Sequence, residues 1–421
     1  MRRTAVIALV SAVVFCAADG ACGGEDTVWP CFHGQRRDNR SAETGLFKTW
    51  PKEGPKLVWT ASGIGHGYSS VAVTGGRIFT AGMKDKQTYV IALDLNGKEL
   101  WRRPNGESWQ AAERQRWAVA YAGARGTPTV DGDTVYHLSD LGRLTAFDVR
   151  TGEERWHVDI MEVFKPPRPK YGYSESVLIL GDRLLFCPGG KEGYVVALDK
   201  RTGRTLWVNT DISDPIAYSS LVLVEIAGVE QVVGLSAARI FAVRIDNGRM
   251  LWQHAFGNKL KNSATDVIVH DGLVYASSGY GKGSVLLRPQ RRDDGGFSVK
   301  PVWESALLDN HHGGVILVDG HLYGAGHEAR GWFCLEFRSG EKRWQASGKG
   351  SLTYADDRLY CLDEKGTMSL IQPTPEKWLV AGSFTVPKGG RGPYWAHPVV
   401  CGGRLYVRHS DRLYAYRLNK E

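Results

Sequence analysis

The stretch Ala92-Leu93-Asp94-Leu95-Asn96-Gly97-Lys98-Glu99-Leu100-Trp101 decides the fold, because its pattern returns along the chain. An alanine, an aspartate, a turn glycine and a tryptophan recur in this order at residues 146–156 and 197–207. Weaker copies end at Trp252, Trp303, Trp344 and Trp378. Successive tryptophans lie 34 to 55 residues apart, a period typical of one four-stranded propeller blade per repeat. The sequence therefore predicts an all-β chain.

Within one repeat, glycine-containing turns separate short runs of β-branched and aromatic residues. In the second copy, Asp131-Gly132-Asp133 separates two such runs, and Arg150-Thr151-Gly152 leads into the run that ends at Trp156. These are hairpin signals, because glycine accepts a positive φ without steric cost. We expect each repeated tryptophan to pack against the neighbouring blade, with its indole N–H bonded to a backbone acceptor.

Trp59 has a strand of its own, residues 55–59, but lacks the three strands that should precede it. Seven complete units follow, and the chain ends with three further runs at 394–400, 404–408 and 412–418. Joining these three runs to the Trp59 strand completes a blade and removes the open edges of the array. The sequence predicts an eight-bladed β-propeller of four-stranded blades over residues 55–421.

The N-terminal region has the pattern of an export signal. Arg2 and Arg3 precede an apolar run that is too short to span a bilayer, and small residues follow it. We expect a signal peptide over residues 1–20 and an N-terminal extension over residues 21–54 that packs on the propeller. No later segment has the length and apolarity of a membrane span. We therefore expect an exported monomer in the periplasm or outside the cell.

Composition narrows the classes of partner. The formal net charge is +8, but lysine and arginine are scattered, and the run Arg291-Arg292 is followed at once by two aspartates. Nucleic-acid binding requires a basic stripe or patch, so we expect no nucleic acid. The 7 cysteines have neither haem nor zinc spacing. Those within strands are typical of small apolar core residues, and a Cys361–Cys401 disulfide is the alternative.

Further motifs extend the pattern over nearly the whole chain. They are Trp29-Pro30, Arg37-Asp38, Trp50-Pro51, Gly172-Tyr173-Ser174-Glu175, His311-His312-Gly313-Gly314 and Trp395-Ala396-His397-Pro398. With the repeat, they resemble the pyrroloquinoline-quinone (PQQ)-like β-propeller proteins, in particular the exported type of planctomycetes. This family includes BamB proteins and the propellers of quinoprotein alcohol dehydrogenases, so the resemblance implies a quinoprotein alcohol dehydrogenase-like fold.

The resemblance also bears on cofactors. In the dehydrogenases of this family, the quinone lies between a tryptophan and a vicinal disulfide, beside a calcium ion held by carboxylate and amide ligands. This sequence has no adjacent cysteines and no recognisable set of calcium ligands. Since the cofactor would carry the redox chemistry, we expect no cofactor, neither PQQ nor calcium. The favoured function is a binding or assembly scaffold in the cell envelope. The alternatives are a quinoprotein-type dehydrogenase, a channel-mouth enzyme, and a metal- or sugar-binding protein.

The strand order places the residues that precede each innermost strand around one mouth of the central channel. The candidate ligand-binding residues there are Arg125, Tyr173, Glu175, Tyr218, Asn262, His311, His312, Trp395 and His397. They fit a polar channel lining with bound water, a site for a small molecule, sugar or peptide, or a metal site. The metal alternative joins His311 or His312 to His397 and Glu175 without any short-range ligand spacing, so we assign no metal. The expected partner is an envelope protein, a peptide or a glycan, and no catalytic residue is assigned.

Two segments exceed the length of a blade connection, and both fall on the same face as the candidate residues. Residues 102–124 carry Trp109 and Trp117, and residues 157–172 carry three prolines. Binding residues concentrate on loops that a rigid scaffold positions. The two segments are therefore expected to be either partner-binding loops or flaps that cover the channel mouth.

Overall fold

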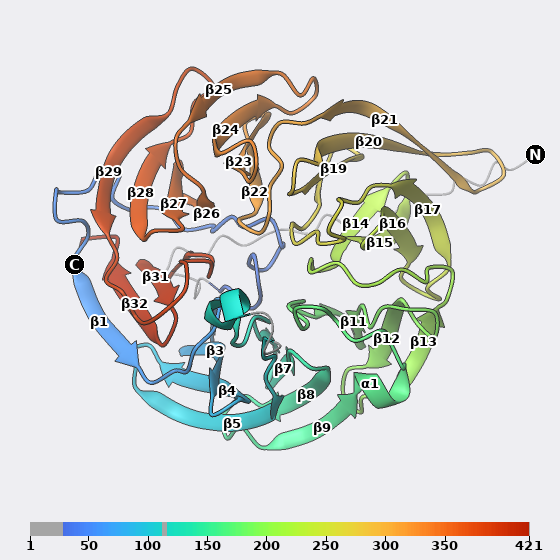
Figure 1. The fold of residues 1–421 in the computed structure, drawn as a ribbon, viewed down its shortest axis with the longest axis horizontal. Coiled ribbons are helices and arrows are strands. Elements are labelled where there is room, and N and C mark those ends of the chain that lie inside the picture. The colour runs from blue at the N-terminus through green and yellow to red at the C-terminus, as the bar shows by residue number, and fades with distance from the viewer. Residues whose placement is uncertain (1–27, 112–115, 421) are drawn as a thin grey trace, which may run out of the picture.

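A computed structural model describes residues 28–111 and 116–420. The chain forms eight four-stranded antiparallel sheets around a central channel (Figure 1). The prediction of an eight-bladed propeller is confirmed. The expected signal peptide, residues 1–20, lies outside the described residues.

Seven blades are each built from four consecutive strands, which run from the channel to the rim. Blade 1 contains β2 (Ala72–Thr74), β3 (Arg77–Lys84), β4 (Gln87–Asp94) and β5 (Glu99–Glu107), and blade 2 contains β6 (Thr129–Asp131), β7 (Thr134–Leu138), β8 (Arg143–Asp148) and β9 (Glu154–Asp159). Blade 3 contains β10 (Leu178–Leu180), β11 (Arg183–Phe186), β12 (Val195–Asp199) and β13 (Thr205–Asn209). Blade 4 contains β14 (Val222–Ile226), β15 (Val229–Leu235), β16 (Arg239–Arg244) and β17 (Met250–Ala255). Blade 5 contains β18 (Ile268–His270), β19 (Leu273–Ser278), β20 (Gly283–Arg291) and β21 (Phe297–Ser305). Blade 6 contains β22 (Val315–Val318), β23 (His321–Gly326), β24 (Gly331–Glu336) and β25 (Lys342–Ala346). Blade 7 contains β26 (Gly350–Ala355), β27 (Arg358–Asp363), β28 (Thr367–Gln372) and β29 (Leu379–Thr385).

The eighth blade joins the two ends of the described chain. It contains β30 (Val399–Cys401), β31 (Arg404–His409), β32 (Arg412–Arg417) and, on the outside, β1 (Leu57–Ser62). In this blade Trp59 pairs with Ala415, and Ser62 pairs with Arg412. The ring is therefore closed by hydrogen bonds between the first strand and the last, as the unaccompanied Trp59 strand predicts.

The repeated tryptophan of one blade packs on the turn glycine of the next. A Cβ on Gly152 would lie 2.6 Å from the indole of Trp101, and one on Gly203 would lie 2.8 Å from the indole of Trp156. The same contact joins Trp59 to Gly97, Trp207 to Gly248 and Trp303 to Gly340. Glycine and tryptophan recur together because they form one interface between neighbouring blades.

Most of the indole N–H groups follow the expected pattern. Backbone carbonyls accept from Trp59, Trp101, Trp156, Trp303 and Trp344. Trp252 instead donates to the side-chain oxygen of Gln231 in its own blade, at 2.7 Å, and the buried indole nitrogen of Trp207 has no hydrogen-bond partner among the described residues. Trp59, Trp101, Trp156 and Trp303 thus have both the glycine contact and a hydrogen bond.

The cysteines of the described residues, Cys31, Cys187, Cys334, Cys361 and Cys401, are buried. Cys361 packs with Leu352 in one buried cluster, whereas Cys401 packs with Val399 in another. No disulfide forms among the cysteines of the described chain. The alternative of a Cys361–Cys401 disulfide is therefore not realised, because the two side chains belong to different clusters.

Residues 29–43, named the plug here, cross the inner strands of all eight blades. Their contacts with successive blades join Trp29 to Val73, Pro30 to Val130, Arg37 to Ser176 and Leu221, His33 to Asp266, Arg40 to Leu317, Ser41 to Tyr354, and Glu43 to Gly402 and Gly403. The plug lies on the face where the first and second strands of each blade meet, named the turn face. Its backbone and side chains bond one segment to the whole ring.

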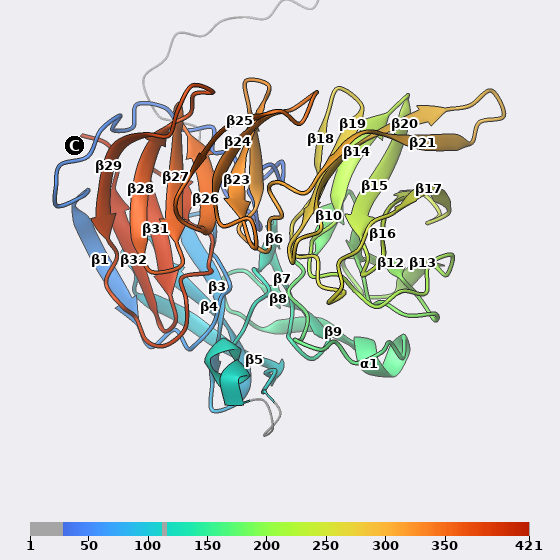
Figure 2. The same ribbon diagram turned by 45° about the horizontal axis from the view of Figure 1, so that its top comes forward.

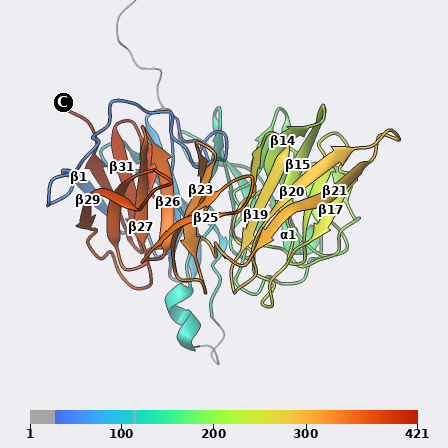
Figure 3. The ribbon, with the colours of Figure 1, turned by 90° about the horizontal axis from the view of Figure 1, so that it is seen from above.

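Two short helices lie on the other face, named the collar face. The 3-10 helix η1 (Arg116–Tyr121) is the teal helix that projects from the blades in Figure 3, opposite the blue plug. The helix α1 (Ile160–Val163) follows β9 on the same side, whereas the β20–β21 hairpin reaches beyond the rim of the ring (Figure 2). No helix in the described chain is both long and apolar enough to span a bilayer.

Candidate functional site

A cavity of about 500 Å³ lies at the mouth of the channel on the collar face. We name it the collar cavity. Its polar and aromatic lining comprises Phe32, Tyr68, Trp109, Tyr121, Arg125, Tyr171, Ser174, Tyr218, Asn262, Tyr280, His311, His312, His327, Lys349, Glu364, Trp395 and His397. These residues come from the plug, from η1 and from connections around the ring. Its volume is in the range of small-ligand sites.

Seven of the nine candidate residues line this cavity. They are Arg125, Tyr218, Asn262, His311, His312, Trp395 and His397. The strand-order argument therefore brings together residues that lie up to 272 positions apart, from Arg125 to His397. It succeeds because every connection from an outermost strand to the next innermost strand reaches the same mouth.

Tyr173 and Glu175 are placed elsewhere, and this corrects the expected site. They border a separate void of about 10 Å³ beside Cys187. The hydroxyl of Tyr173 donates to the Pro188 carbonyl at 2.9 Å, and Glu175 Oε2 accepts from the Cys187 N–H at 2.8 Å. Ser174 between them lines both this void and the collar cavity.

Aromatic rings form one wall of the collar cavity. Tyr121 stacks on Trp395 with ring centroids 4.9 Å apart and an interplanar angle of 15°. Tyr68 contacts the same indole at 5.3 Å. Across the mouth, the guanidinium of Arg125 lies 4.9 Å from the ring centroid of Trp109. The wall offers large flat surfaces with few rotatable bonds, which suits stacking on a ring of a ligand.

Histidines lie directly beside this aromatic wall, with the ring centroid of His312 4.6 Å from that of Trp395. The Tyr280 hydroxyl lies 2.9 Å from His311 Nε2, and His312 Nδ1 lies 3.2 Å from His311 Nδ1. The His327 ring centroid is 4.6 Å from that of His311. No three His, Cys, Asp or Glu side chains in the described residues have an arrangement that would hold a metal ion. The imidazoles instead contact one another, Tyr280 and Trp395.

Burial keeps these imidazoles uncharged. It lowers the pKa of His311 to about 3 and the pKa of His397 to about 3, and it moves the pKa of His312 in the same direction. Nearby cations add to the effect, since Lys349 lowers the pKa of His311 as well. At neutral pH the histidine wall is therefore polar but neutral.

One ion pair lies at the edge of the histidine wall. Lys349 Nζ lies 3.0 Å from Glu364 Oε1 and 2.8 Å from His327 Nδ1. The same Glu364 oxygen accepts from the Trp395 indole N–H at 2.8 Å. The carboxylate therefore orients both the lysine and the indole that carries the aromatic wall.

The plug forms the floor of the cavity. Phe32 lines it, and the Phe32 and His33 rings stack at 3.8 Å. His33 Nε2 lies 3.1 Å from His397 Nδ1, while His397 Nε2 lies 2.7 Å from the His312 carbonyl. The plug thus closes the channel below the cavity and fixes His397 from beneath.

The family follows from a comparison with family models. The model described as "Outer membrane protein assembly factor BamB" matches residues 50–161 and 86–346. The chain belongs to the BamB family. The match covers most of the ring, from the end of the N-terminal extension to the end of β25.

Individual relatives are distant. BamB of Burkholderia pseudomallei (strain K96243) is 24% identical over 271 residues, which cover 56% of this chain and 68% of the relative. BamB of Salmonella typhimurium is 25% identical over 222 residues, 51% of this chain and 48% of the relative. The chain thus spans between about half and two thirds of the length of these BamB proteins. The quinohemoprotein alcohol dehydrogenase ADH IIB of Pseudomonas putida is 32% identical over 123 residues, 28% of this chain and 17% of the relative.

Solved structures agree on the fold. BamB from Moraxella catarrhalis superposes with a TM-score of 0.61 at 16% identity, covering 87% of this chain and 98% of the other. The quinohemoprotein alcohol dehydrogenase ADHIIG from Pseudomonas putida HK5 gives 0.63 at 13% identity, covering 94% and 81%. Both are propellers of the predicted type, so the resemblance read from the sequence motifs is confirmed.

Several cavity residues of this BamB-family propeller were not among the candidates. Tyr280 lies between β19 and β20, Glu364 lies between β27 and β28, and Lys349 directly precedes β26. Each occupies a connection that reaches the collar face, so the strand-order rule applies to it. The strand-order rule does not apply to Phe32, because the plug belongs to no blade.

Proposed function

We propose that this protein is an exported scaffold for assembly work in the cell envelope, which holds a partner at the collar cavity and uses no redox cofactor. Two facts support the scaffold role. The chain belongs to the BamB family, and its relatives are named as outer membrane protein assembly factors. Propellers present such partners with a rigid ring that positions variable connections.

The observation that carries the proposal is the chemistry of the collar cavity. A stacked Tyr121–Trp395 pair adjoins a group of neutral histidines in the cavity lining. Flat rings and uncharged hydrogen-bonding groups suit an uncharged ring, such as a sugar or the aromatic side chain of a peptide. The favoured partner is therefore a peptide segment of an envelope protein, or a glycan, that inserts one ring into the cavity.

A quinoprotein-type dehydrogenase is the second candidate, because Pseudomonas putida alcohol dehydrogenases share the fold. The donor set of the collar cavity does not suit a calcium–quinone pair. None of the cysteines in the described chain lines the cavity, and its one lining carboxylate, Glu364, is engaged by Lys349 and Trp395. This argument supports the scaffold over the dehydrogenase.

Site-specific photo-crosslinking tests the proposal. Leu260 lines the cavity and is 43% exposed, and Leu100 on the outer strand β5 is 44% exposed. A benzoylphenylalanine at position 260 is expected to capture a defined partner in envelope extract, whereas one at position 100 is not. Trp395→Ala should abolish the capture at 260, since it removes the stacking surface. Equal capture at both positions would contradict the proposal.

Reconstitution tests the second candidate directly. Purified protein is mixed with PQQ and calcium, and binding is followed together with dye-linked alcohol oxidation. The scaffold proposal expects neither stoichiometric binding nor oxidation. If both occur, the protein is a dehydrogenase and the scaffold proposal is wrong.

A further inference from the structure

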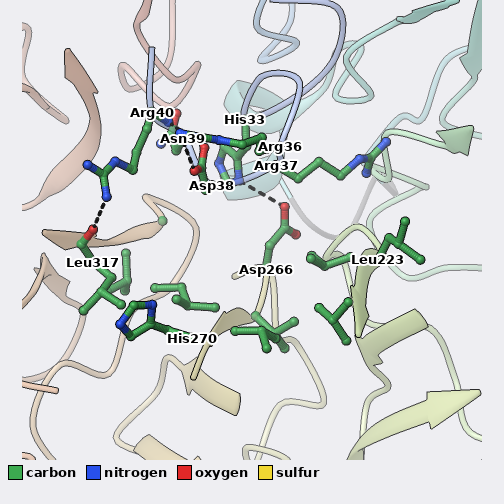
Figure 4. Close-up of a pocket in the computed structure, with 17 residues that line it drawn as sticks. His33, Arg36, Arg37, Asp38, Asn39, Arg40, Leu223, Asp266, His270 and Leu317 are labelled. Atoms are coloured by element: carbon green, nitrogen blue, oxygen red, sulfur yellow. Dashed lines mark hydrogen bonds and ion pairs between the residues drawn. The ribbon is translucent and has the colours of Figure 1, made fainter. Parts of the chain in front are cut away.

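A second cleft lies on the turn face, between the plug and the innermost strands of three blades (Figure 4). Its volume is about 230 Å³, and plug residues 36–40 form its roof. The strands β14, β18 and β22 supply its floor. It shares no lining residue with the collar cavity, so a ligand here would be independent of the one proposed there.

The roof carries three arginines. Arg37 is only 6% exposed and donates to the Ser176 carbonyl at 2.8 Å and the Leu221 carbonyl at 3.3 Å. Arg40 Nη1 donates to the Leu317 carbonyl at 3.1 Å, as the dashed line in Figure 4 shows, while its buried Nε has no hydrogen-bond partner in the described chain. Neither arginine has an ion-pair partner among residues 28–111 and 116–420.

A buried guanidinium without a carboxylate is costly, because carbonyl dipoles replace only part of its hydration. The third arginine, Arg36, has a side chain that is 68% exposed and pairs only with Asp38, at 3.0 Å. The roof therefore has more positive than negative charge. A carboxylate bound in the cleft would supply the missing counter-charge.

Acceptors line the same cleft. Asp266 has a side chain that is 4% exposed, and its Oδ2 faces His33 Nδ1 at 3.1 Å (Figure 4). Asn39 is 2% exposed, and its side-chain oxygen has no hydrogen-bond partner within the described residues, although its amide nitrogen donates to the Leu352 carbonyl. A pure anion would be repelled by Asp266. A ligand that carries a donor or a positive group as well as a carboxylate satisfies both sets.

The floor is apolar. Val224, Ile268, Val269 and Leu317 are partly exposed to the cleft, and Leu223 is 39% exposed at its edge. Burying an aliphatic side chain there is favourable, because it removes apolar surface from water. The cleft thus combines a cationic roof, buried acceptors and an aliphatic floor in a space for one small molecule.

We propose that this cleft binds a free aliphatic α-amino acid. The carboxylate lies toward the arginines of the plug, the ammonium lies toward Asp266 and Asn39, and the side chain rests on the floor of β14, β18 and β22. Because the plug supplies the roof, the ligand bonds the plug to blades 4, 5 and 6. This gives residues 36–40 a binding role beyond closing the channel.

Calorimetry with L-leucine and three analogues tests the proposal on the full-length protein. Leucinamide lacks the carboxylate, 4-methylpentanoate lacks the ammonium, and glycine lacks the side chain. Each is expected to bind at least about tenfold more weakly than leucine, since each loses one charged or apolar contact. Absence of saturable leucine binding overturns the proposal, and so does leucinamide or 4-methylpentanoate binding as tightly as leucine.

Four variants localise the site. Arg36→Ala should weaken leucine binding, and Val269→Trp should abolish it by filling the cleft, with circular dichroism confirming that each variant is folded. Arg292→Ala is the matched control, because this arginine is also exposed and pairs with a nearby aspartate, Asp294. Trp395→Ala in the collar cavity should leave leucine binding unchanged. Unchanged binding in both cleft variants would overturn the proposal while leaving the proposed function untouched.

Discussion

The rim of the propeller and the interior of its channel are built by opposite rules. At the rim, one contact recurs in five blade pairs, with the tryptophan of one blade on the turn glycine of the next. The channel shows no such repeated contact. Several different residues of the plug meet the blades, and every blade contributes different side chains to the collar cavity. The repeated residues at the rim therefore specify the fold, whereas residues in the channel that do not repeat form the candidate sites.

The difference also determines whether a substitution in each region lowers stability or weakens binding. Rim contacts fix the distance between blades, so a change there is felt by the whole ring. Side chains at the collar instead border a cavity of about 500 Å³. We therefore expect stability to depend mainly on the rim and the closure, and binding to depend mainly on the channel.

The largest effect is expected from breaking the closure. Deleting residues 400–421 removes β31 and β32, so β1 and the seventh blade lose their neighbours. The shortened chain should show no cooperative thermal transition by circular dichroism, because an open array exposes unpaired edges. A chain that ends after Asn419, beyond the last strand, is the control and should melt like wild type. Cooperative melting of the shortened chain would mean that closure does not hold the ring together.

The glycine under each tryptophan gives the next effect. Gly152 and Gly132 both have positive φ, +70° and +57°, but only Gly152 faces an indole, since no atom lies within 4 Å of a Cβ at Gly132. Gly152→Val and Gly132→Val share the backbone strain, and Gly152→Val adds the clash with Trp101. Urea unfolding should show Gly152→Val less stable than Gly132→Val by about 1–3 kcal/mol. Equal losses would show that the tryptophan contact contributes nothing.

The rim was predictable from the sequence and the plug was not. The residues of this interface, such as Trp101 and Gly152, have equivalents in several copies of the repeat, so the pattern can be recognised in one sequence. Phe32 and His33 occur once, in a segment without periodicity, and nothing in their spacing indicates that they reach His397. A single sequence specifies a site residue only when a repeated strand order fixes its place.

Tyr173 and Glu175 show the limit of that argument. The strand order places residues 173–175 near the mouth, but of the three only Ser174 lines the collar cavity, while all three border the small void beside Cys187. Predicting the position of a connection is thus easier than predicting which of its side chains faces the channel.

Glu175 provides an effect that depends on pH. Burial raises its pKa to about 8, so the folded protein favours the protonated acid more than the unfolded chain does. The stability from this group is full below pH 4.5 and is lost as the pH rises through 8, by up to about 1.4 kcal/mol per pH unit. Glu175→Gln keeps a neutral acceptor for the Cys187 N–H. Its stability relative to wild type should rise between pH 5 and 8 in urea titrations, and a pH-independent difference would show that the carboxyl is hydrated.

The smallest effect is expected at the collar, where partner binding should hardly change between pH 8 and 5. Burial holds the pKa values of His311 and His397 at about 3, so the histidine wall keeps its neutral form throughout this range. Photo-crosslinking from position 260 at pH 5, 6, 7 and 8 measures partner binding directly. A separate test of the histidine wall is the stability of the Tyr280→Phe variant, which lacks the hydroxyl that contacts His311. That variant should lose less than about 1.5 kcal/mol of stability. A fall in capture centred near pH 6 would show that the imidazoles titrate as hydrated groups, and the neutral wall would then not describe how the partner is held.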